Sequence, residues 1–226
     1  NIGTVHSRWF FYTPAAVPFG MAKLGASTNG TYGNEQGWEA VGYDETHTSI
    51  DGFPCMHEFQ IGGILLMPTV GAVKNIPGKL ETPDEGYYSV LLKDYQEKVE
   101  LTATERVGFQ RYSFPKSDSS HVIMDIGNRL GESGNVRDAY IKQVDESTIE
   151  GYVVTEPEYV KKYQAGATVP MYFYAKLSQS PNSVNVLFRG KDLMEKTEIK
   201  GAGAMMVLNY DTSKDQVIDL KIGLSY

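Results

Sequence analysis

The sequence predicts an all-β protein, folded as one large antiparallel β-sandwich with long loops and little helix. From residue 87 onward, short segments rich in β-branched and aromatic residues recur at intervals of about 8–12 residues, as is typical of sandwiches. No segment keeps an apolar period of about 3.6 residues beyond roughly three turns, so no long helix is indicated. The 23 glycines and 15 tyrosines suit aromatic strands that are joined by tight turns.

The first part of the chain is predicted to consist of extended segments and loops. Residues 14–21, PAAVPFGM, contain Pro14 and Pro18, which exclude a helix and favour an extended segment with turns. Residues 27–35, STNGTYGNE, are rich in Gly and Asn and predict a loop. The apolar run 61–67, IGGILLM, predicts a short buried strand that ends at Pro68, and a loop follows it.

The rest of the chain is predicted as one strand after another. The segment 99–106 alternates, with Val99, Leu101 and Ala103 on one side. Two segments, 139–144 and 148–155, flank a polar turn and predict a hairpin. The other predicted strands are 87–92, 107–114, 121–126, 170–177, 184–188, 204–209 and 217–224. Polar connections are predicted at 127–138 and 191–198, and either a short helix or a loop within 156–169. No linker divides the chain, so residues 1–226 are assigned to one domain.

Charge and composition exclude several classes of partner. The net charge of −7 argues against nucleic acid and against anionic membranes, because both repel an acidic surface. The single cysteine, Cys55, excludes an internal disulfide framework and a cysteine-built zinc site. No stretch approaches the roughly 20 apolar residues of a membrane span. The chain begins at Asn1 and ends in a strand-like segment, from which we expect a processed start and a cut between domains.

The stretch 37–63 concentrates the residues that could bind a polar ligand, and we expect it to form a glycine-bounded loop. Trp38 follows Gly37; its indole ring could stack on the apolar face of a sugar, or could fill the core beneath the loop. His57 and Glu58 could hydrogen-bond ligand hydroxyls or bind a metal, but the second histidine of a zinc-binding helix is missing. Taken alone, this pair favours a scaffolding role.

The sequence does not assemble a catalytic group. Asp44, Glu45 and Asp51 lie in a turn-rich stretch, where aspartates mostly cap turns. Cys55 has no matching His–Asn pattern, and the sequence contains no G-x-S-x-G motif that would make the serines near His121 nucleophilic.

Four ordered stretches in the first half of the chain resemble the N-terminal domain of family 92 glycoside hydrolases, the exo-acting α-mannosidases of bacteria. They are PAAVPFGM at 14–21; GW and GY at 37–43 with IDGF at 50–53 and His57; LMPTVG at 66–71; and PDEGYYSV at 83–90 with ELTAT at 100–104 and RYSFP at 111–115. The second half of the chain resembles the family only as a run of strands. Together these stretches are far more specific than any one of them.

The resemblance implies a sandwich of the supersandwich type that packs on a separate (α/α)6 barrel. In the family, the barrel carries the catalytic acid, the carboxylate base and a calcium ion, and the reaction inverts the anomeric centre. This chain is therefore expected to hold no catalytic residue, metal or cofactor, and to be inactive by itself. Its expected partners are the barrel and a mannose-containing glycan, and its expected location is secreted, either periplasmic or at the cell surface.

The resemblance assigns the carbohydrate contacts to Trp38 and His57 by motif position, and to Tyr43 and Glu58 by adjacency alone. The chain departs from the family pattern at Ala15, at 54–56 and 58–62 around His57, and at the inserted residues 84–85. The preferred linkage therefore cannot be transferred. Two alternatives stay open: a self-sufficient carbohydrate-binding module with Trp38 as its platform, and a purely structural sandwich.

Overall fold

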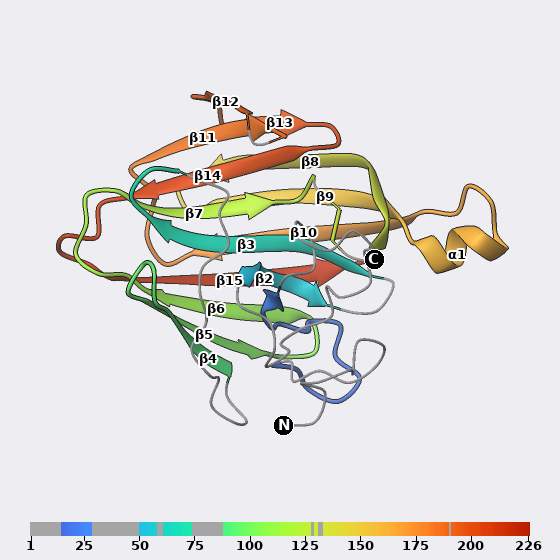
Figure 1. Ribbon diagram of the computed structural model, residues 1–226, viewed down its shortest axis with the longest axis horizontal. Helices are drawn as coiled ribbons and strands as arrows, with labels where there is room; N and C mark the ends of the chain where they lie inside the picture. The colour runs from blue at the N-terminus through green and yellow to red at the C-terminus, as the bar shows by residue number, and fades with distance from the viewer. Residues whose placement is uncertain are drawn as a thin grey trace.

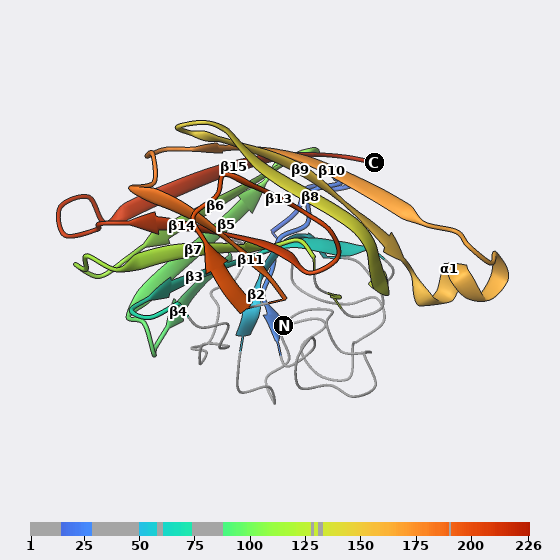
Figure 2. The same cartoon turned by 90° about the horizontal axis from the view of Figure 1, so that it is seen from above.

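The computed structural model describes residues 15–28, 50–57, 61–73, 88–127, 129–130, 133–189 and 191–226. Within them, two antiparallel sheets pack face to face as the two layers of a sandwich (Figures 1 and 2). One short helix, α1 (Glu158–Tyr163), lies beyond the end of the sheets (Figure 1). The prediction of an all-β antiparallel sandwich with little helix is confirmed. No helix among the described residues is long and apolar enough to cross a membrane.

Both sheets mix strands from distant parts of the chain. The first sheet has the order β1 (Ser27–Thr28), β2 (Ile50–His57), β3 (Gly62–Val70), β7 (Ser120–Asp125), β14 (Ala204–Tyr210), β11 (Ser183–Phe188) and β12 (Lys191–Met194). The second has the order β13 (Glu198–Lys200), β8 (Asn135–Asp145), β9 (Thr148–Glu156), β10 (Val169–Leu177), β15 (Val217–Ser225), β6 (Val107–Ser113), β5 (Glu97–Ala103) and β4 (Tyr88–Leu92).

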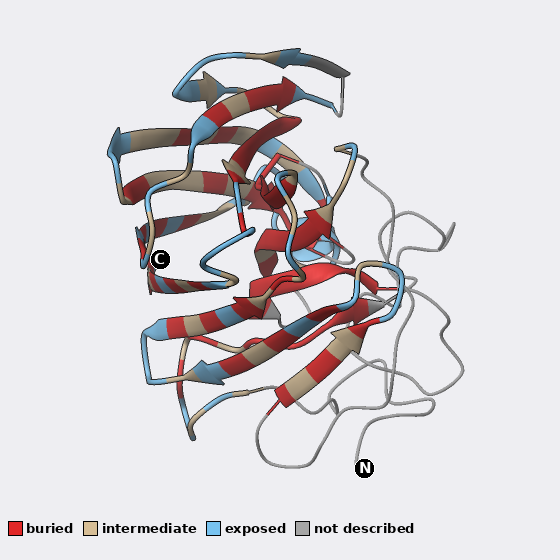
Figure 3. Cartoon of the chain, turned by 90° about the vertical axis from the view of Figure 1, so that its left-hand side faces the viewer, coloured by how far each residue is buried: buried red, intermediate tan, exposed pale blue. Residues whose placement is uncertain are grey.

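Alternation of apolar and polar residues decides which face of the eight-stranded sheet meets the core. In β10, Met171 and Phe173 are buried, whereas Tyr172 and Tyr174 are exposed, and Figure 3 shows the same banding along the neighbouring strands. Successive side chains of a strand point to opposite faces, so the tyrosines lie on the outer surface. The central strands of the seven-stranded sheet differ, because β7 is buried at every position, on both faces.

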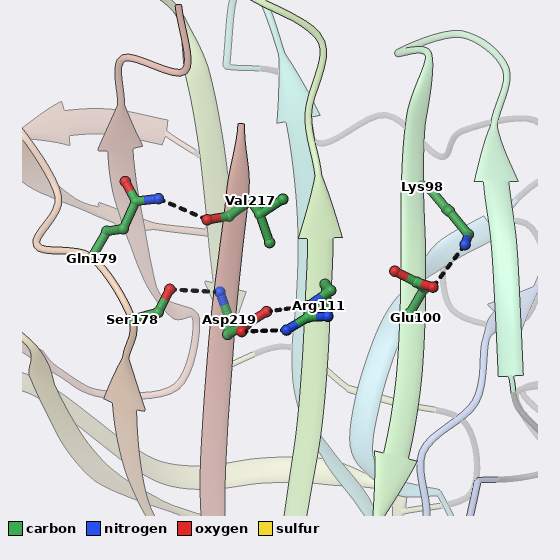
Figure 4. A network of polar contacts seen from close by, with 7 residues as sticks. All are labelled: Lys98, Glu100, Arg111, Ser178, Gln179, Val217 and Asp219. Atoms are coloured by element: carbon green, nitrogen blue, oxygen red, sulfur yellow. Dashed lines mark hydrogen bonds and ion pairs between the residues drawn. The ribbon is translucent and has the colours of Figure 1, made fainter. Parts of the chain in front are cut away.

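Two charged pairs lie on the outer face of the eight-stranded sheet, on the half formed by β15, β6 and β5 (Figure 4). Arg111 of β6 donates to both carboxylate oxygens of Asp219 on β15, at 2.7 and 2.9 Å. The two residues are direct cross-strand partners, so the register itself brings them together. On β5, Lys98 lies 2.7 Å from Glu100. This half of the face is therefore a solvated polar surface.

The hairpin predicted within 139–155 is confirmed as β8 and β9. Of the two alternatives left open within 156–169, a short helix or a loop, the structure shows the helix, α1. The predicted end of a strand at Pro68 is wrong, because β3 continues through Pro68, which pairs with Val122 of β7. On its other side, the pairing of β3 with β2 reaches only to Leu66, so the missing N–H interrupts no ladder there.

Some predicted connections are in fact strands. Lys191–Met194 and Glu198–Lys200 form β12 and β13, the outermost strands of their sheets, and β8 begins at Asn135 inside a predicted polar loop. Ser27–Thr28 forms β1, where a loop was predicted. Edge strands are short and often polar, so they lack the alternation by which strands are recognised in a sequence.

Candidate ligand-facing end of the sandwich

The second part of the candidate stretch 37–63 is strand and not loop. Residues Ile50–His57 form β2, and β3 starts at Gly62, directly opposite His57 in the antiparallel ladder. The structure therefore places the His57 backbone at the last position of a sheet strand. Trp38, Tyr43 and Glu58 lie outside the described residues, as does the His57 side chain. Their predicted role in carbohydrate binding stays a prediction.

A buried amide holds β2 against the opposite sheet. The Gln110 side chain of β6 is fully buried, and its Nε2 donates to the Phe53 carbonyl oxygen and to Cys55 Sγ, each at 3.2 Å. The Tyr112 hydroxyl donates to Gln110 Oε1 at 2.5 Å. Because these groups are buried, each lost hydrogen bond would leave a polar atom unsatisfied. The network therefore fixes the position of the strand that ends at His57.

Glycines at the start of β3 allow the neighbouring chain to approach closely. A Cβ added to Gly62 would lie 3.0 Å from Leu130 Cδ2, and one added to Gly63 would lie 3.2 Å from Met171 Cε. Both distances are shorter than ordinary van der Waals contact. Side chains of other segments thus pack directly on the β3 backbone beside His57.

The carboxylates of β9 and α1 near this end are paired with arginines. Arg137 Nη2 lies 2.5 Å from Glu156 Oε1, and Arg129 Nη1 lies 3.4 Å from Glu158 Oε1. Glu156 is nearly fully buried, whereas Arg137 is largely exposed. A guanidinium beside a buried carboxylate offsets part of the cost of burying its charge. These groups therefore stabilise the end of the sandwich.

A small cavity lies beside them, with a volume of about 10 Å³. The Asp125 carboxylate on its wall accepts a hydrogen bond from the Gly127 N–H at 3.2 Å. The buried Thr155 hydroxyl has no hydrogen-bond partner among the described residues. Such a space holds about one water molecule and is far too small for a sugar ring. It is lined by Gly62, Gly63, Leu65, Asp125, Ile126, Arg129, Leu130, Val153 and Thr155.

Cys55 and His121 are structural residues. Burial raises the pKa of the Cys55 thiol to about 12, so the thiolate needed for nucleophilic attack is not formed at neutral pH. His121 Nε2 lies 3.1 Å from the hydroxyl oxygen of Ser119, one of the serines that were not expected from the sequence to be nucleophilic. However, its two ring nitrogens also face carbonyl oxygens, Nε2 that of Gly71 at 2.9 Å and Nδ1 the Asn209 amide at 2.8 Å. Both ring nitrogens are thus engaged by groups of a loop and of a neighbouring strand, so His121 ties loop to sheet.

The described residues also contain no cluster of three or more His, Cys, Asp or Glu side chains that could hold a metal ion. The part of the chain that the structure describes is thus a large antiparallel sandwich. The chain matches the family model "Glycosyl hydrolase family 92 N-terminal domain" over residues 1–225, and it belongs to this family.

Solved structures share the fold of this chain. The family GH92 α-mannosidase BT3965 from Bacteroides thetaiotaomicron matches 99% of this chain with a TM-score of 0.83 and 22% identity. The GH92 glycosyl hydrolase ccman5 matches 99% with a TM-score of 0.78 and 19% identity. The inverting mannosidase BT2199 from B. thetaiotaomicron VPI-5482 matches 97% with a TM-score of 0.76 and 18% identity. At these identities the likeness establishes the fold.

The chain spans only about a third of the length of these structures, 32%, 31% and 29% of the respective chains. No curated protein matches the chain significantly.

Proposed function

We propose that this chain is the non-catalytic N-terminal domain of a bacterial exo-acting α-mannosidase-like glycoside hydrolase. The observation that carries the proposal is the family match over residues 1–225, together with the fold shared with GH92 mannosidases. Its partner is a C-terminal (α/α)6 barrel of the same protein, which supplies the inverting acid and base. In this proposal the calcium ion, too, is held by that barrel. The protein is secreted, to the periplasm or the cell surface.

In this proposal, the domain lends loop side chains to a mannose pocket that it shares with the barrel. Trp38 stacks on the sugar ring and His57 hydrogen-bonds its hydroxyls, with Tyr43 and Glu58 as further contacts. Two observations support a shared pocket. Gln110 anchors β2 at Phe53 and Cys55, in the strand that ends at His57. The cavity lined by Gly62, the ladder partner of His57, is too small for a sugar ring, so a sugar would need a second wall from the barrel.

The test compares this 226-residue chain with a longer protein that includes the sequence downstream. The longer protein should hydrolyse an aryl α-mannoside, and the chain alone should not. In the longer protein, Trp38→Ala should raise KM about tenfold or more, as expected for the loss of a central aromatic contact. The matched control is Trp9→Ala, at the only other tryptophan. Hydrolysis by the chain alone at rates typical of glycosidases would refute the proposal.

Titration of the chain alone with mannose and mannobiose separates the two alternatives. Binding that disappears in Trp38→Ala would indicate a self-sufficient carbohydrate-binding module. If the chain alone binds neither sugar, and Trp38→Ala and His57→Ala leave the KM of the longer protein unchanged, the domain is purely structural. Cell fractionation and surface proteolysis test the proposed location.

A further inference from the structure

A row of tyrosines crosses the outer face of the eight-stranded sheet. Tyr140 on β8, Tyr152 on β9 and Tyr172 on β10 are direct cross-strand neighbours. The ring centroids of Tyr140 and Tyr152 lie 6.0 Å apart, and those of Tyr152 and Tyr172 also lie 6.0 Å apart. Tyr174 stands two residues further along β10, on the same face. Tyr172 and Tyr174 are about half exposed, at 49% and 48%.

Acidic side chains hold two of these rings in place. The Tyr140 hydroxyl donates to Glu198 Oε2, and the Tyr152 hydroxyl donates to Asp138 Oδ2, each at 2.8 Å. Rings that are already fixed lose little conformational entropy when a ligand binds. The row is therefore a preorganised aromatic surface.

Charges of both signs surround the row, and the exposed Lys221 of β15, which pairs with Lys176, lies at its margin. The outer-face neighbours of the tyrosines include three acidic residues and three lysines; they are Asp138, Glu150, Glu198, Lys142, Lys176 and Lys200. Acidic and basic groups are also close to one another, as Lys200 Nζ lies 3.6 Å from Asp138 Oδ2. Such a mixture attracts neither a polyanion nor a polycation, but it offers both donors and acceptors. It complements an uncharged, hydroxyl-rich ligand.

The flank of the row on β15 is open. Gly223 pairs with Tyr174, and a Cβ added to Gly223 would meet only the Tyr174 carbonyl oxygen, at 3.7 Å. Ser225, which pairs with Tyr172, is exposed. These small residues leave the β15 side of the row uncrowded, in contrast to the paired charges of Arg111 and Asp219 on the other half of the face (Figure 4). On the side away from β15, the Lys176 ammonium lies over the Tyr174 ring, 5.7 Å from its centroid.

We propose that Tyr140, Tyr152, Tyr172 and Tyr174 form a surface site for a neutral oligosaccharide, on which sugar rings stack along the sheet. Aromatic rings with an apolar face and a polar edge suit such a ligand, because a sugar has the same two characters. The site lies on the outer surface of one sheet, whereas β2 and His57 belong to the other sheet. It would hold a polymeric glycan near the enzyme, and the choice of an α-mannan rests on the proposed function.

Electrophoresis of the longer protein through native gels that contain soluble yeast α-mannan tests the site. Tyr172→Ala should weaken the retardation about tenfold, as for the loss of an aromatic anchor, while Tyr172→Phe, which keeps the ring, should retain it. The matched control is Tyr163→Ala, an exposed tyrosine on α1 away from the row. Thermal unfolding of each variant tests whether it is folded. If Tyr172→Ala does not fold, Tyr174→Ala takes its place.

Hydrolysis of a small aryl α-mannoside is the separate readout, and it should be unchanged in Tyr172→Ala. Loss of retardation with unchanged hydrolysis supports the surface site. Equal migration of Tyr172→Ala and Tyr163→Ala in the mannan gel overturns it. The proposal also fails if the row is buried in a concentration-dependent dimer, or if the remainder of the longer protein covers it. Absence of hydrolysis in every variant would refute the proposed function while leaving the retardation result to be judged by itself.

Discussion

Glu97 should make the stability of the domain fall as the pH rises. Its side chain at the start of β5 is fully buried, and neither carboxylate oxygen has a hydrogen-bond partner among the described residues. Burial raises the pKa of this carboxyl well above its ordinary value. In the unfolded chain the same group ionises near pH 4.3. Over the intervening range, folding takes up a proton.

The size of the effect follows from proton linkage. Where Glu97 is protonated only in the folded state, each pH unit lowers the free energy of unfolding by about 1.4 kcal/mol. The contribution is complete below the unfolded pKa and is lost as the pH rises toward the folded pKa. The loss over each such pH unit is a sizeable part of the about 5–15 kcal/mol of a typical domain.

Glu97→Gln removes the titrating group and keeps the shape. In urea unfolding at a series of pH values, the free energy of unfolding of the variant should rise relative to that of the parent chain. We expect a relative rise of about 1.4 kcal/mol per pH unit above pH 5. Glu146→Gln, in the exposed turn between β8 and β9, is the matched control and should show no such gain. A difference between Glu97→Gln and the parent that stays constant from pH 5 to pH 7 would mean that Glu97 is ionised in the fold, and would refute the reasoning.

Three further predictions concern the contacts of the sandwich. Gln110→Leu leaves the Phe53 carbonyl and the Tyr112 hydroxyl without their partner, and should cost about 2–4 kcal/mol in urea unfolding; a loss below 1 kcal/mol would show that the network does not hold β2. Cys55 should resist an aromatic disulfide reagent at pH 8 and react once urea unfolds the chain, because burial raises its pKa to about 12; rapid reaction of the folded protein would contradict this. Asp219→Asn breaks a partly exposed ion pair and should cost less than about 1 kcal/mol, whereas a larger loss would point to a structural role for that pair.

The strands with clear alternation could be predicted from the sequence, and those whose pairing depends on distant residues could not. In β10 and β15, alternate residues are apolar, so the local pattern suffices. In β2, Gly52 and Pro54 are residue types that strands avoid, and the strand is held by β3 and by Gln110 from the other sheet. No residue pattern within 50–57 indicates these contacts.

For the candidate site, too, local sequence patterns can be distinguished from contacts between distant residues. Motif positions assign Trp38 and His57 to the carbohydrate contacts, because a family pattern is a local property of the sequence; this assignment stays a prediction, since Trp38 and the His57 side chain lie outside the described residues. The contacts of His121 could not be predicted, because Gly71 and Asn209 are 50 and 88 residues away in the chain. The tyrosine row likewise arises only when β8, β9 and β10 are brought side by side in register.

The connection between β9 and β10, which contains α1, offers an attachment point for probes. No residue of α1 is buried, and Gly166, just after the helix, has a positive φ of 79° with no atom within 4 Å of an added Cβ. Exposed loop tips of this kind tolerate insertion, because no core contact depends on them. A short tag or a fluorophore placed there would leave both sheets intact. In the longer protein, energy transfer from that label would report how far the sandwich stands from the domain beside it.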